Sequence, residues 1–130
     1  MKNNENKLLI YTYPLRLYIS DKDVIDKLNN INNMSANDYI KSAIYEQIML
    51  SNSVLYSVSP SSGKIYMQKA IRLYKNREKD MAIYNFIQEN NKEHSNWFNS
   101  FVRYCLHNDI DSQNNKIKYY DNEENLESEY

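Results

Sequence analysis

The chain has 130 residues, of which 42% are hydrophobic and 25% charged, so it fits one compact domain or two very small repeats that share a core. With Gly 1 and Pro 2, it lacks the residues that phosphate-binding loops, dinucleotide-binding folds and turn-rich β-sandwiches need. A single cysteine excludes an intramolecular disulfide and a cysteine-rich zinc site. No apolar run is long enough for a signal peptide or a membrane span, and we expect a cytoplasmic protein.

The charge of the chain is unevenly distributed. Residues 1–108 hold 14 Lys and Arg against 10 Asp and Glu, a net charge of +4, whereas residues 109–130 hold 2 against 7, a net charge of -5. The sum is the overall -1. The sequence therefore predicts a mildly basic body followed by an acidic C-terminal tail.

The first part of the chain predicts a strand followed by two helices. Residues 8–19 are rich in β-branched and aromatic side chains, as in a strand. Residues 21–32 carry apolar side chains at helical spacing, and their aspartates suit the positive end of a helix dipole. Ser35 is a natural N-cap for a second helix. We take residues 8–50 as one strand-helix-helix unit.

The same order then returns after a Ser-, Pro- and Gly-containing linker at residues 51–69, which could form a short hairpin. Residues 70–74 repeat residues 14–18 at an offset of 56, and the sequence from Ser95 repeats that from Ser35 at an offset of 60. The two offsets differ by four residues, so we expect about one extra helical turn between these segments of the second unit. The second unit spans 70–108, and 109–130 form the acidic tail.

Residues 15–48 and 71–106 carry a resemblance to the ribbon-helix-helix family of DNA-binding proteins, the Arc and MetJ group. The resemblance implies a mainly α fold with a short β-ribbon, a tandem ribbon-helix-helix pseudo-dimer whose two strands pair within one chain. The alternative is a winged helix-turn-helix, with helices at 21–32 and 35–49 and a wing at 53–69.

A two-stranded ribbon fits the major groove, where Arg bonds guanine and Asn bonds adenine. Strand residues alternate between faces, so the residues between the apolar positions face outward. The side chains expected to read bases are Arg16, Tyr18, Ser20, Arg72, Tyr74 and Asn76. Because the third members of the two sets differ, we expect an asymmetric DNA site.

The resemblance also implies that the second helix of each unit binds phosphate through backbone N–H groups at its N-terminus. The matching positions are Ser35, Ala36, Asn37, Ser95 and Asn96. Lys41, on the second helix of the first unit, is expected to contact the DNA backbone without regard to sequence.

Nothing in the sequence points to catalysis. His94 and His107 have no cysteine or carboxylate at metal-ligand spacing, and Cys105 lies on an apolar helical stripe, as a core residue does. We expect no enzyme activity, no cofactor and no metal.

Together these observations predict sequence-specific binding of double-stranded DNA, by an autorepressor or a plasmid maintenance, partition or transfer factor. The chain would bind as a monomer or as higher assemblies on direct repeats, and no membrane is involved. Residues 109–130 are either a solubilising end or a segment that binds a partner protein. The alternative function is a helical protein-interaction module, such as a phage-encoded inhibitor, whose outward arginines contact protein.

Overall fold

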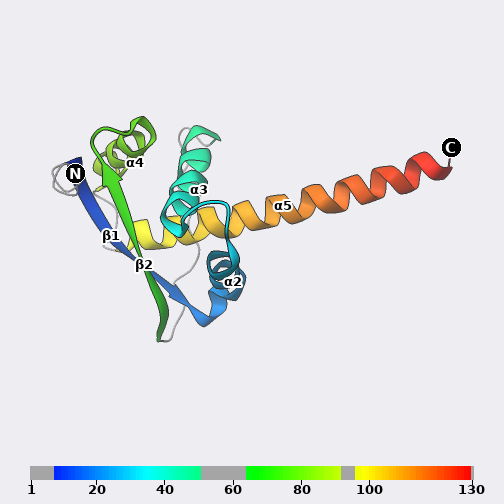
Figure 1. The fold of residues 1–130 in the computed structure, drawn as a ribbon, viewed down its shortest axis with the longest axis horizontal. Helices are drawn as coiled ribbons and strands as arrows, with labels where there is room; N and C mark the ends of the chain where they lie inside the picture. Colours follow the sequence, from blue (N-terminus) through cyan, green and yellow to red (C-terminus); the bar gives the residue numbers. More distant parts are fainter. Residues whose placement is uncertain (1–7, 51–63, 92–95, 130) are drawn as a thin grey trace.

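The computed structural model describes residues 8–50, 64–91 and 96–129, with side chains described as far as Gln113. Its elements are β1 (Leu9–Tyr18), the short 3-10 helix η1 (Ile19–Asp21), α2 (Lys22–Asn30), α3 (Ala36–Leu50), β2 (Ile65–Tyr74), α4 (Glu78–Glu89) and α5 (Trp97–Glu129). The strands form a two-stranded antiparallel sheet, and each is followed by helices (Figure 1). The fold is therefore mainly α with a ribbon made by tandem β-α-α units, as the sequence predicts.

The register of the ribbon reveals an approximate twofold axis. Pro14 lies opposite Ala70, and these residues are themselves equivalent in the two repeats, 56 positions apart. The pairing is regular from Tyr11 to Leu17 on β1. Residues 65–69 pair with β1, so this part of the expected linker belongs to a strand and not to the wing of the alternative fold. The remainder of the expected linker, 51–63, lies outside the described residues.

The core lies between the ribbon and the helices. Leu15, Leu17, Ile71 and Leu73 alternate along the strands and are fully buried, each with 0% exposure. They pack against apolar side chains from the helices, among them Ile40, Ile44, Ile83, Phe101 and Val102. Because burial of one such side chain contributes roughly 1.5–3 kcal/mol, this layer is a main source of stability. The described helices cover only one face of the ribbon.

The outer edges of both strands are capped by the second helix of the other unit. The backbone N–H of Arg16 donates to Asn99 Oδ1 at 2.8 Å, and the Arg16 carbonyl accepts from Asn99 Nδ2 at 3.2 Å. On the other edge, the Arg72 N–H donates to Asn37 Oδ1 at 3.0 Å and its carbonyl accepts from Lys41 Nζ at 3.1 Å. These bonds satisfy backbone N–H and carbonyl groups that could otherwise pair with the strand of another molecule.

Two buried ion pairs connect the units in the same reciprocal way. Asp21 of the first unit lies 2.9 Å from Arg103 Nε of the second, and Asp80 of the second unit lies 2.8 Å from Lys41 Nζ of the first. Each carboxylate also accepts the N–H of the last residue of its own strand, at 2.9 and 3.0 Å. The expectation that Lys41 contacts DNA is wrong, because its side chain is buried in this pair.

The equivalent contacts also correct the alignment of the repeats. Asp21 and Asp80 are 59 positions apart, and Asn37 and Asn99 are 62 apart. The extra residues therefore lie in two connections, after β2 and after α4, and not within a helix. Accordingly, η1 and α2 together span Ile19–Asn30, as many residues as α4. The expected offset of 60 and the extra helical turn are both wrong.

The last helix is longer than the sequence predicts. The second unit is expected to end at residue 108, but α5 continues to Glu129 and projects away from the rest of the molecule (Figure 1). Its side chains still contact the core beyond His107, since Ile110 packs against it and Asp109 accepts a hydrogen bond from the Tyr39 hydroxyl. In the portions of the chain that the structure describes, no helix combines the length and the apolar character needed to cross a membrane.

Candidate nucleic-acid interface

The uncovered face of the ribbon presents three cross-strand pairs. Pro14 and Ala70 occupy the centre, and the pairs Thr12–Arg72 and Arg16–Gln68 flank it. The backbone N–H groups of both arginines point to the strand edges, so these are non-hydrogen-bonded pairs, whose side chains lie closest together. Thr12, Pro14, Gln68 and Arg72 are exposed, and Arg16 and Ala70 are half-buried. We call these six residues the outer ribbon face.

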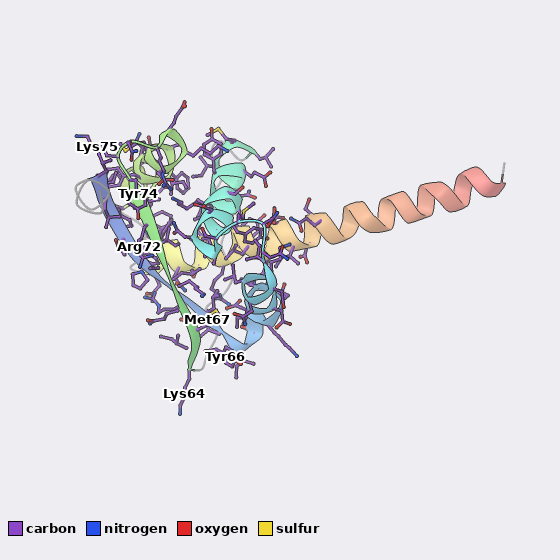
Figure 2. The ribbon with its side chains drawn as sticks, viewed as in Figure 1. Lys64, Tyr66, Met67, Arg72, Tyr74 and Lys75 are labelled. Carbon is purple, nitrogen blue, oxygen red and sulfur yellow. The ribbon has the colours of Figure 1, made fainter. Side chains whose placement is uncertain are left out.

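The ribbon and its flanks carry positive charge only. Residues 8–20 and 64–77 contain no Asp or Glu, and their cations are Arg16, Lys64, Lys69, Arg72, Lys75 and Arg77. All but Arg16 belong to β2 and the residues beside it. Figure 2 shows Lys64 and Lys75 at opposite ends of β2, with Arg72 between them. A polyanion alongside the ribbon would be attracted by these cations, and the nearby exposed carboxylates of Asp38 and Glu78 lie beyond them, in a pocket shared with Arg77.

The two arginines of this face have different surroundings. Arg16 Nη2 lies 3.4 Å from the Tyr13 hydroxyl and 3.3 Å from Asn96 Oδ1, so its guanidinium is held against the start of α5. The guanidinium of Arg72 makes no hydrogen bond or ion pair with any described residue, and it is exposed. Arg72 is therefore the freer of the two to reach a ligand.

The structure separates the six residues expected to read bases. It brings Arg16 and Arg72 together on the outer ribbon face. Tyr18 and Tyr74 end the strands and are half-buried, with Arg103 Cζ 5.1 Å from the first ring centroid and Lys41 Nζ 5.5 Å from the second. These tyrosines contact the cations of the two buried ion pairs.

Ser20 and Asn76 are exposed but lie beyond the paired strands, in η1 and in the turn after β2. The base-reading roles of all six residues remain predictions. Sequence reasoning missed Thr12 and Gln68, although one signal pointed to them. Placing the equivalent residues Pro14 and Ala70 opposite each other would have brought Thr12 and Gln68 onto the face of the arginines.

The expected phosphate-binding positions lie beside the ribbon edges. Ser35 Oγ accepts the N–H of Asp38 at 3.0 Å, which confirms Ser35 as an N-cap. Ala36 and Asn37 form the first turn of α3, where Asn37 caps β2. Asn96 is exposed directly before α5, and its carbonyl accepts the Ser100 N–H at 3.2 Å. Ser95 lies outside the described residues. Phosphate binding by these positions remains a prediction.

A cluster of charged groups holds the end of β1 to α5. His107 Nε2 lies 2.7 Å from Asp21 Oδ1 and His107 Nδ1 lies 3.0 Å from Asp23 Oδ2. Burial raises the pKa of Asp21, but hydrogen bonds from His107 and Arg103 outweigh it and lower the pKa to about 2. The bond to Asp21 raises the pKa of His107, and Asp23 adds to the rise while burial opposes it. Both ring nitrogens can donate only in the imidazolium, so this geometry requires the charged histidine.

The described residues offer little for other chemistry. They contain no group of three or more His, Cys, Asp or Glu side chains that could hold a metal ion. Cys105 is buried in the core, as predicted, and burial raises the pKa of its thiol, which makes it a poor nucleophile. Protein-family models, curated proteins and solved structures were compared with the chain, and none matched.

Proposed function

We propose that the protein binds double-stranded DNA in a sequence-specific manner, by placing the outer ribbon face in the major groove. The observation that carries this proposal is the ribbon itself, whose uncovered face bears hydrogen-bonding side chains and whose length bears cations without carboxylates. The tandem β-α-α order resembles the ribbon-helix-helix family. On that resemblance, we propose a role as an autorepressor or a plasmid maintenance, partition or transfer factor.

The chemistry of the outer ribbon face suits base edges. A two-stranded ribbon has the width of the major groove, and the helices leave this face uncovered. Arg72 and Arg16 can donate to guanine O6 and N7, and Gln68 can bond adenine N6 and N7. The small central pair Pro14–Ala70 lets the ribbon approach the floor of the groove closely.

Contacts to the sugar-phosphate backbone would come from both sides of the ribbon. The cations at the ends of β2 lie where the walls of a groove would pass, and they supply affinity that does not depend on sequence. The N-termini of α3 and α5 lie at the two strand edges, placed there by Asn37 and Asn99. The N–H groups of the first helical turn and the helix dipoles favour phosphate at those points.

The test measures binding to duplex DNA as salt is raised, with one matched pair of variants. Arg72→Ala removes an exposed cation of the outer ribbon face, and Lys79→Ala removes an exposed cation of α4 whose ammonium lies 5.2 Å from the Tyr45 ring centroid on α3. We expect log affinity to fall linearly with log salt, by about 0.9 per phosphate contacted. Arg72→Ala should cost roughly 1–3 kcal/mol on a selected site, and Lys79→Ala much less.

Salt-independent binding, or equal losses from the two variants, would contradict the proposal. Absence of binding to any duplex at low salt would instead favour the helical protein-interaction module, in which the arginines contact an acidic protein surface. A partner protein for residues 109–130 remains a prediction that these experiments do not address.

A further inference from the structure

We infer that the chain reads an asymmetric duplex in one fixed orientation, with the Arg16–Gln68 pair over neighbouring guanine and adenine and the Thr12–Arg72 pair over a guanine. This inference rests on the proposed function and deepens it. It follows from a difference between the two halves of the outer ribbon face, and from the fact that both halves belong to one chain.

The twofold axis through Pro14 and Ala70 exchanges Arg16 with Arg72 and Thr12 with Gln68. The arginines match under this exchange, but the other two residues do not. A glutamine amide both donates and accepts, so it can bond N6 and N7 of one adenine together, which a single threonine hydroxyl cannot do. Within the outer ribbon face, only the half that contains Gln68 therefore specifies adenine.

The restraint on the arginines adds a second difference. Asn96 accepts from the Arg16 guanidinium at 3.3 Å. Its equivalent in the first unit, 62 positions earlier, is Met34, which has no carboxamide oxygen to offer Arg72. The Arg16 side chain is thus restrained at the strand edge and must exchange its bond to Asn96 for one to a base, whereas Arg72 must be ordered by its ligand. The two guanine contacts differ in position and in the entropy lost on binding.

Charge makes the flanks unequal as well. On residues 64–77 the exposed cations are Lys64, Arg72, Lys75 and Arg77, whereas residues 8–20 contribute Arg16 alone; Lys69 lies on the covered face opposite Leu15 and is not counted. Phosphates beside β2 therefore meet more positive charge than phosphates beside β1. An asymmetric set of base contacts combined with an asymmetric set of phosphate contacts gives one orientation the lower free energy.

The experiment selects duplexes from a pool with a randomised core of about 20 base pairs, a length that covers more than one ribbon. The full chain is compared with Thr12→Gln, Gln68→Thr and the double exchange Thr12→Gln/Gln68→Thr. Both positions are exposed, so the core is untouched, and circular dichroism with thermal melting checks the fold of each variant.

We expect the wild-type motif to be non-palindromic, with adenine specified in one half only. Thr12→Gln should add an adenine at the symmetry-related position and make the motif nearly palindromic. Gln68→Thr should lose the adenine preference and bind the wild-type duplex about tenfold more weakly.

Orientation is measured with an iron chelate attached through Lys64→Cys, at one end of β2 (Figure 2), since the native Cys105 is buried. Cleavage should fall on one flank of the motif for the wild type and on the opposite flank for the double exchange. A palindromic wild-type motif, or equal cleavage of both flanks, overturns the inference while DNA binding stands. Failure to enrich any duplex overturns both the inference and the proposed function.

Discussion

Replacement of Asp21 by Asn should destabilise the protein strongly, because it removes the negative charge from a buried ion pair between the units. Arg103 would remain buried, with 5% of its side chain exposed, and would lose its ion pair with Asp21. Loss of one partner of such a pair costs about 3–5 kcal/mol. The fall in the pKa of Asp21 from 3.8 to about 2 corresponds to about 2 kcal/mol at 1.36 kcal/mol per unit, which is below this range because burial of the carboxylate opposes its hydrogen bonds. Because Asn can still accept the Tyr18 N–H, we expect about 3 kcal/mol.

The assay is equilibrium unfolding in urea at neutral pH, followed by the fluorescence of Trp97. This residue is the single tryptophan of the chain and is buried, with its ring centroid 5.3 Å from that of Phe98. The matched variant is Asp80→Asn, which removes the carboxylate from the pseudo-equivalent pair with Lys41. Arg103→Met on the Asp21→Asn background also removes the buried charge of Arg103, so it should recover part of the loss, while His107 keeps its contact with Asp23.

Two results would refute this reasoning. A loss below about 1 kcal/mol for Asp21→Asn would mean that solvent compensates Arg103 as it does at a surface pair. A further loss on adding Arg103→Met would mean that the two charges are not coupled, and that Arg103 contributes through packing alone. An unchanged dependence on urea is needed in each case to show that the unfolded states are comparable.

Three further predictions follow from the same packing. The folded pKa of His107 is raised above its ordinary 6.5, so the contribution of His107 to stability is complete below pH 6.5 and is lost as the pH rises through the folded pKa. Urea titrations from about pH 6 to pH 9 should show this loss of stability. The variant His107→Gln should not show this pH dependence. Leu17→Ala, at a fully buried position, should lower the unfolding free energy by about 2–5 kcal/mol, whereas Ile19→Ala, at a position 74% exposed, should change it by less than about 0.5 kcal/mol; equal effects would place the core elsewhere. Deletion of 114–130 should leave the melting temperature nearly unchanged, whereas deletion of 109–130 should lower it, because Asp109 accepts the Tyr39 hydroxyl and Ile110 packs on the core.

Several features of the fold could be predicted because they follow from local patterns in the sequence. The repeat of residues 14–18 at 70–74 predicts a second strand, and the family resemblance implies that the two strands pair within the chain, which is confirmed. The Ser35 N-cap and the buried state of Cys105 are confirmed as well. These features depend on neighbours in the sequence or on alternation along one element, which is why they can be recognised without coordinates.

The contacts between the units could not be predicted in the same way. Asp21 and Asp80 look like ordinary acidic residues near the start of a helix, where the dipole favours them. Their partners Arg103 and Lys41 lie 82 and 39 positions away, and no local spacing connects them. The offset between the repeats also changes in each connection, so equivalent residues cannot be aligned until the contacts themselves are seen. The residues of the outer ribbon face could not be listed from the sequence for the same reason, because they depend on the register of the two strands.

The divergence of the two units itself favours pairing within one chain. The capping asparagines, the carboxylates and the cations are retained in both units, so charge alone would allow either unit to pair with its own copy. The sizes of the side chains at one reciprocal contact, in contrast, favour pairing of unlike units. Tyr13 packs edge-on against Phe98 with centroids 4.9 Å apart, and the equivalent positions in the reciprocal contact are Lys69 and Ala36. Pairing of like units would place Lys69 against Phe98 and Tyr13 against Ala36, which loses the ring contact and buries a lysine against an aromatic ring. Sedimentation velocity at increasing concentration should therefore show one species with the mass of a single chain, and a concentration-dependent dimer that persists when the ribbon is intact would contradict this account.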